Sequence, residues 1–271
     1  MHLVLLILFV AFFNVSAQSV NTRMGGRAAA MGQAFFAASA DASAMFQNAG
    51  ALAFCESSSV FFAYELTPSL PGANRTAAAV TWQSQLGTFA AGTFRFGDDI
   101  YSEQILAGAY SNRIGDTSLG LKANVIQYRA DGFGIRTAFT VDVGGLTRIT
   151  PEWTVGAGIF NVNQASIAAG EDLPIILVGG LGWKAPDGPL LTAELEKRLE
   201  SPLRIRGGME VDLSRRALVR TGFNLHPLMI TGGVGFKFPI GFMDFATAYH
   251  EIFGFTCQAS ASYIIGKPSG L

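Results

Sequence analysis

Residues 203–213 read LRIRGGMEVDL, and this stretch decides the fold. Polar and apolar residues alternate along it, which is the period of two expected of a β-strand. The polar face carries full charges at Arg204, Arg206, Glu210 and Asp212, so it does not belong in an ordinary protein core. The apolar face recurs on other segments and needs an apolar cover. A closed barrel with lipid outside and a polar lumen inside satisfies both faces and leaves no open sheet edge.

The composition agrees with a membrane barrel. Hydrophobic residues make up 49% of the chain, charged residues only 14%, and the mean hydropathy is +0.33. Yet no stretch beyond the first residues reaches the roughly 18 apolar residues of a membrane-spanning helix. The net charge of −1 gives no electrostatic reason to expect nucleic acid as a partner. We therefore expect outer-membrane lipids around the chain.

Alternating segments fill the region from residue 57 to residue 265 and predict an all-β fold, a transmembrane antiparallel up-and-down β-barrel of about 14 strands. The expected strands are residues 57–65, 76–85, 88–96, 103–111, 117–128, 136–149, 153–163, 174–184, 190–199, 203–213, 217–225, 229–238, 243–251 and 255–264. With both termini in the periplasm, short turns face inward and the longer connections at 66–75, 97–102, 129–135 and 164–173 face outward.

The chain begins with an expected signal peptide, residues 1–17. An apolar run over residues 3–13 is followed by a small-x-small cleavage site at residues 15–17, with Gln18 as the mature start. This predicts Sec export to the bacterial outer membrane, and residues 266–271 then form a periplasmic tail. Two cysteines, Cys55 and Cys257, fall at opposite ends of the expected barrel, so we expect them to be unpaired.

Residues 18–56 precede the first strand and differ from the rest of the chain. They are rich in alanine, which favours short helical turns, and Asp41 is placed to cap the second of them. Glycines at 25, 26, 32 and 50 interrupt any long helix. A small-residue segment ahead of a barrel predicts a plug that folds into the lumen; a periplasmic arm is the alternative.

Several motifs resemble those of FadL-like outer-membrane barrels, most closely the PorV/PorQ branch associated with type IX secretion. They are RAAAMGQAF at 27–35, DASA at 41–44 and NAGAL at 48–52, followed by RGGME, RTGF, TGGVGF and DFATAYH from residue 206 onward. Gln33 and Ala49 depart from the usual glycine and proline. The resemblance marks a plug motif at Arg27, Met31, Gly32, Asp41, Asn48 and Gly50. It implies a non-enzymatic role in type IX protein secretion or surface attachment, with secretion proteins or exported cargo as partners.

The lumen face of the later strands carries the densest set of ionisable residues. Alternation directs these side chains inward: Glu194, Glu196, Arg204, Arg206, Glu210, Asp212, Arg220, Lys237 and Asp244. Plausible registers place Glu196 opposite Arg206, Glu210 opposite Arg220, and Lys237 opposite Asp244, where opposite charges stabilise a sheet. Such a network is either a polar conduit or plug-docking surface, or a charge ladder that only fills a narrow lumen.

No arrangement of residues points to catalysis, and no metal or other cofactor is expected. The histidines do not cluster at metal-ligand spacing, and no nucleophile elbow is present. Besides the secretion role, a FadL-like channel for hydrophobic small molecules such as fatty acids is possible. It predicts an apolar pocket near Phe35, Phe36 and Phe46. A structural barrel without transport is the third possibility.

Overall fold

A computed structural model describes residues 22–39, 41–168, 171–199, 201–251 and 253–265. The expected signal peptide and periplasmic tail lie outside these residues. Among the described residues, no helix has both the length and the apolar character required to cross a membrane.

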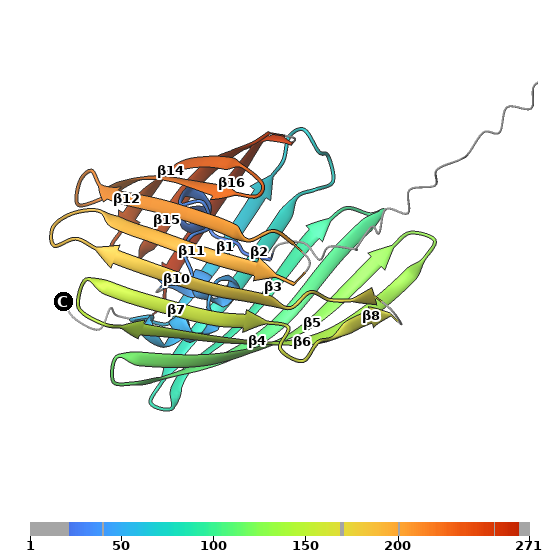
Figure 1. Ribbon diagram of the computed structural model, residues 1–271, viewed down its shortest axis with the longest axis horizontal. Helices are drawn as coiled ribbons and strands as arrows, with labels where there is room; N and C mark the ends of the chain where they lie inside the picture. The colour runs from blue at the N-terminus through green and yellow to red at the C-terminus, as the bar shows by residue number, and fades with distance from the viewer. Residues whose placement is uncertain (1–21, 40, 169–170, 200, 252, 266–271) are drawn as a thin grey trace, which may run out of the picture.

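Fourteen antiparallel strands close into a barrel, which confirms the predicted fold (Figure 1). The barrel strands are β1 (Ser59–Leu66), β2 (Arg75–Ser84), β3 (Gly87–Gly97), β4 (Tyr101–Ile114), β5 (Thr117–Ala130), β6 (Gly134–Arg148), β7 (Trp153–Phe160), β10 (Ile176–Lys184), β11 (Leu190–Arg198), β12 (Arg204–Asp212), β13 (Ala217–Leu225), β14 (Met229–Phe238), β15 (Gly241–His250) and β16 (Gly254–Ile264). Each pairs with its neighbour in sequence, and β1 pairs with β16 to close the ring. A separate two-stranded hairpin, β8 (Ser166–Ala168) with β9 (Glu171–Asp172), lies in the connection from β7 to β10.

We call the end of the barrel that holds Ser59 and Ile264 the near end, and the opposite one the far end. Turns at the near end are short, as expected: only two residues join β2 to β3, β4 to β5, and β14 to β15. At the far end, the expected loops at 97–102 and 129–135 shorten to residues 98–100 and 131–133, because β4, β5 and β6 extend to 14 or 15 residues each. The longest connection runs from β7 to β10 and contains the β8–β9 hairpin, which sequence analysis missed.

The outward face of the barrel is apolar and exposed. Leu106, Leu119 and Ile230 all belong to barrel strands, yet they are 67%, 64% and 63% exposed. Inward neighbours on the same strands are buried, so burial alternates with a period of two, for example along β5. A soluble protein rarely exposes so large an apolar surface.

The segment before β1 folds into the lumen as a plug, which we define as residues 22–56. It contains one turn of α-helix, α1 (Gly26–Ala30), and two 3-10 turns, η1 (Ala42–Phe46) and η2 (Ala49–Phe54). Helix α1 contacts the wall formed by β13 to β16, whereas η2 contacts β4, β5 and β6 on the other side. The ribbon passes inside the barrel between these two walls (Figure 1).

The plug packs with its backbone directly against glycines in the barrel wall. A Cβ atom on Gly50 would lie 2.6 Å from Gly144 O, and one on Gly208 would lie 2.6 Å from Met31 O. Gly32 has a φ of +66°, a conformation that other residues rarely adopt, and it faces the backbone of Phe223. Small residues in both partners therefore allow this close approach. Cys55, at the end of η2, is buried, and Cys257 is exposed on β16; neither is in a disulfide.

Candidate functional site in the barrel lumen

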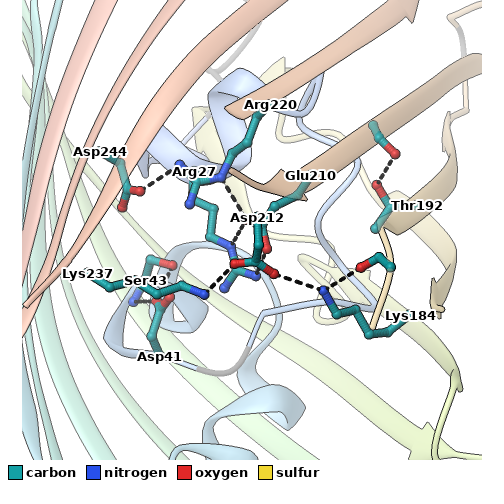
Figure 2. A network of polar contacts seen from close by, with 12 residues as sticks. Arg27, Asp41, Ser43, Lys184, Thr192, Glu210, Asp212, Arg220, Lys237 and Asp244 are labelled. Atoms are coloured by element: carbon teal, nitrogen blue, oxygen red, sulfur yellow. Dashed lines mark hydrogen bonds and ion pairs between the residues drawn. The ribbon is translucent and has the colours of Figure 1, made fainter. Parts of the chain in front are cut away.

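Arg27 of α1 joins the plug to the charged wall (Figure 2). Its guanidinium donates two hydrogen bonds to Glu210, from Nε to Oε2 and from Nη2 to Oε1, both at 2.7 Å. Arg220 donates to the same carboxylate at 2.7 Å and to Asp244 Oδ1 at 2.7 Å. Two arginines and two carboxylates therefore form a chain with no net charge, and one of its cations comes from the plug.

A second cluster lies around Glu194 and Glu196 on β11. Arg206 Nη1 is 2.6 Å from Glu194 Oε1, and its Nη2 is 2.9 Å from Glu196 Oε2. Arg23 of the plug forms an ion pair with Glu194 and lies 3.5 Å from Glu196. Arg204 and Arg198 contact Glu196 at 3.1 Å and 3.5 Å. Four guanidinium groups therefore share two carboxylates, and the cluster has a surplus of positive charge.

The registers differ from the prediction for two of the three expected pairs. Glu210 does lie opposite Arg220. Arg206 instead lies opposite Glu194, because the last pair before the connection is Glu196 with Arg204, where we expected residue 199 with residue 203. It still reaches Glu196 diagonally.

The expected pair of Lys237 with Asp244 is also wrong. Lys237 lies opposite Phe242, because the turn between β14 and β15 has only two residues, where we expected four. Its Nζ is 2.6 Å from Asp212 Oδ1, and Lys184 Nζ is 3.3 Å from the other oxygen of the same carboxylate (Figure 2). These three residues are partly exposed at the near end.

Each plug-motif residue contributes to the folding or docking of the plug. Asp41 caps η1 by accepting a hydrogen bond from Ser43 N at 2.8 Å. Asn48 caps η2 through Gly50 N and donates at 3.0 Å to both Phe36 O and Gly145 O. The remaining motif residues, Arg27, Met31, Gly32 and Gly50, make the ion pair and the close backbone contacts described above.

The wall opposite these charges is mostly apolar, which the sequence analysis did not recognise. Small and branched side chains from β1 to β6 point into the lumen and pack with Met45 and Phe46 of the plug. They include Ala63, Ala77, Ala79, Ala90, Phe94, Ile105, Ala107 and Ile126. Two ion pairs interrupt this wall, one between Lys122 and Asp142 at 3.1 Å and one between Arg75 and Glu65. The lumen therefore has a densely charged side on β11 to β15 and a mostly apolar side on β1 to β6.

A cavity of about 80 Å³ lies in the far half of the lumen, where these two walls meet. Its apolar lining comprises Ile105, Ile126, Phe160, Leu173, Pro174 and Ile176. Its charged lining comprises Arg23, Lys122, Asp142, Glu196 and Arg198. Arg198 is only 8% exposed, and its Nε makes no hydrogen bond. The cavity therefore offers an apolar surface beside a buried cation with unused hydrogen-bonding capacity.

Two further cavities lie at the near end, of about 350 and 250 Å³, and both are lined by Arg27, Glu210 and Lys237. The plug lies between them and the far cavity. At the boundary, Phe36 N donates to Glu194 at 3.0 Å, and the Phe36 ring packs edge-on against Phe160, with centroids 6.1 Å apart.

The three rings of the expected apolar pocket, Phe35, Phe36 and Phe46, do not themselves line these cavities, although Phe36 packs against Phe160, which lines the far cavity. These rings are 0%, 1% and 5% exposed, and none of them lines the far cavity or either near cavity. They fill space between plug and barrel.

Sequence analysis missed some of the site residues. Arg23 lies in no alternating segment, so no sequence pattern indicated it. Alternation did indicate Lys122 and Asp142, since both occupy inward positions on predicted strands and lie directly opposite each other.

The fold is similar to that of several solved bacterial channels. The toluene transporter TbuX of Ralstonia pickettii matches with a TM-score of 0.67 and 11% identity, over 91% of this chain and 99% of that one. The toluene transporter TodX of Pseudomonas putida gives 0.66 and 10%, over 90% and 98%. A FadL homologue of Pseudomonas aeruginosa gives 0.63 and 13%, over 91% and 98%. No protein-family model matches the chain, and no curated protein matches it in sequence. At these identities the likeness is one of fold.

Proposed function

We propose that this chain is a bacterial outer-membrane channel for hydrophobic small molecules that carry an acidic group, such as fatty acids. Two observations support the location: the apolar outward face, and a fold shared with toluene transporters and a FadL homologue. The choice of ligand rests on the far cavity, which we take as the binding site. On this proposal the chain has no enzymatic activity.

The observation that carries the proposal is the buried, incompletely bonded Arg198 beside an apolar surface. Arg198 Nε has no hydrogen-bond partner, and the nearest carboxylate oxygen, Glu196 Oε1, lies 3.5 Å away. A buried donor without a partner is costly, and a ligand carboxylate would satisfy it. The same carboxylate would offset the surplus positive charge of the cluster, while an alkyl chain would lie against Ile105 and Ile126.

The far cavity is too small to enclose a whole fatty acid. At about 80 Å³ it is smaller than a cavity of about 150 Å³ that accepts benzene in another protein, and a long alkyl chain is larger than benzene. On this proposal the cavity therefore holds the carboxylate end, and the rest of the chain displaces lining side chains or extends beyond the cavity. We expect a fatty acid to bind better than toluene because only the acid can pair with Arg198.

Calorimetric titration of the purified barrel with dodecanoate tests this proposal. Arg198→Gln keeps a hydrogen-bonding side chain but removes the charge, and we expect it to weaken dodecanoate binding about tenfold, or ~1.4 kcal/mol. Dodecanol, which has the same chain without the acid, should bind both proteins equally. Lys184→Gln, a change at the near end, is the matched control. If neither dodecanoate nor dodecanol binds the unaltered barrel, the channel proposal is wrong.

The type IX secretion role is a second candidate and rests on the sequence motifs alone. Because the residues of the plug motif serve to fold and dock the plug, any barrel with this plug would need them, and they do not single out a secretion component. Affinity purification from the native outer membrane, followed by mass spectrometry, separates the two. Recovery of a secretion translocon or of exported cargo would favour this second role over solute passage.

A further inference from the structure

Charge on the outward face of the barrel is confined to three residues. Among the fourteen strands, all of which the structure describes, outward positions carry only Arg95 on β3, Arg129 on β5 and Lys197 on β11. All three are basic, exposed, and close to the far-end terminus of their strand. The other charged strand residues occupy inward positions, where they face the plug, the lumen or an opposite charge.

Arg95 and Arg129 belong to one patch. The register places Arg95 opposite Gln104, and Gln104 opposite Gln127, which is the next outward residue before Arg129 on β5. The two arginines are thus two strands and two residues apart, or about 12 Å between Cα atoms at usual sheet spacings. Their flexible side chains can reach a common ligand.

The patch lies where the apolar outward faces of β4 and β5 end. On β5 the outward residues toward the far end are Leu121, Ala123 and Val125, then Gln127 and Arg129. On β4 the same change occurs between Leu106 and Gln104. In a membrane, the boundary between apolar and polar residues is the level of the lipid headgroups.

Neither arginine forms an ion pair or a side-chain hydrogen bond within the described part of the chain. Acidic residues are present in the adjoining turns, at Asp98, Asp99 and Asp131. The Asp98 carboxylate accepts hydrogen bonds from Ile100 N at 2.9 Å and Tyr101 N at 3.0 Å. The two guanidinium groups are therefore available to an external anion.

We propose that Arg95 and Arg129 bind the phosphate of an anionic lipid in the membrane leaflet at the far end. Arginine binds phosphate through paired N–H donors, and the apolar outward residues below it offer a surface for the acyl chains of the same lipid. Such a lipid has both parts in one molecule, which is why we choose it over a soluble phosphate. The proposal depends on the membrane location proposed above but not on what the barrel transports.

Native mass spectrometry of the detergent-purified mature chain tests this site, with bisphosphorylated lipid A as the probe. We expect the double variant Arg95→Gln/Arg129→Gln to weaken lipid A binding at least about tenfold, because two charge-assisted contacts are lost. Lys197→Gln is the matched control, since it removes the third outward cation, four strands away from β5. It should leave lipid A binding unchanged.

Two further probes identify what is recognised. Dephosphorylated lipid A should bind the unaltered barrel as weakly as lipid A binds the double variant, and millimolar inorganic phosphate should not displace lipid A. Equal binding of the dephosphorylated lipid, displacement by inorganic phosphate, or an equal loss in Lys197→Gln would each overturn the proposal. Dodecanoate titration of the double variant distinguishes the lipid site from the far cavity, because dodecanoate binding in the far cavity should be unaffected. Heat-modifiable gel migration confirms that the variant is folded.

Discussion

Arg27 contributes the cation that the charged wall lacks. Without it, Glu210 and Asp244 would share the single positive charge of Arg220. Removing one partner of a buried ion pair commonly costs about 3–5 kcal/mol, because the remaining charge is left uncompensated. Here the remaining arginine compensates in part, and Arg27 itself is 27% exposed, so the cost should be lower.

We predict that Arg27→Met lowers the free energy of unfolding of the barrel by about 2 kcal/mol, measured by urea titration in detergent. The double variant Arg27→Met/Glu210→Gln should recover part of this loss, since it also removes the unpaired charge. Lys184→Met is the control, because the Lys184–Asp212 pair is roughly 40% exposed and such pairs contribute at most about 1 kcal/mol. Equal losses in both single variants would show that Arg27 acts only as a surface charge.

At the scale of elements, the plug is held by its backbone as much as by its charges. Gly144 of β6 faces Asn48 and Gly50, and a side chain at this position would collide with η2. Cys55, directly after η2, reports on this contact, since it is buried and burial raises the pKa of its thiol. A buried thiol with a raised pKa reacts slowly with alkylating reagents.

We predict that Cys55 of the unaltered barrel resists maleimide labelling at pH 8, whereas Gly144→Val exposes it and allows labelling within minutes. Gly179→Val is the matched control, because a side chain there meets no atom within 4 Å. Quantitative labelling by mass spectrometry, with Cys257 replaced by serine, separates the two thiols. Fast labelling of Cys55 in the unaltered barrel would contradict a docked plug.

Comparing the predicted strands with the observed ones shows what alternation in the sequence can and cannot predict. It identified all fourteen barrel strands and the inward side chains, because the period of two is a local property. It misplaced the Glu196–Arg206 and Lys237–Asp244 registers, because register depends on where each turn begins and ends, which alternation does not determine. It missed Arg23, whose position depends on how the irregular plug enters the lumen, and it missed the apolar wall, since alanines on β2 and β3 look neutral in isolation.

At the scale of the whole molecule, the plug lies between two cavities in the far half of the lumen, of about 80 and 160 Å³, and the two near cavities. The described residues between them include Arg23, Phe36 and Asn48, each bonded to the barrel wall or packed against it. These contacts narrow the lumen in the part of it that the structure describes. A hydrophobic solute would therefore have to pass beside the plug or displace part of it.

We predict that the intact chain shows no steady ion conductance in a planar lipid bilayer, whereas deletion of residues 22–54 opens the lumen and produces one. The deletion removes Arg23 and Arg27 as well as η1 and η2, so the densely charged side of the lumen becomes hydrated. Heat-modifiable migration must first show that the shortened barrel is folded.

The variant Arg23→Gln/Arg27→Gln provides a second test, because it keeps the plug but loses its ion pairs. If backbone packing against the wall glycines is enough to close the lumen, this variant stays closed. If it conducts like the deletion, the ion pairs rather than the backbone contacts hold the plug in place. Conductance of the intact chain equal to that of the deletion would show that the plug does not close the barrel at all.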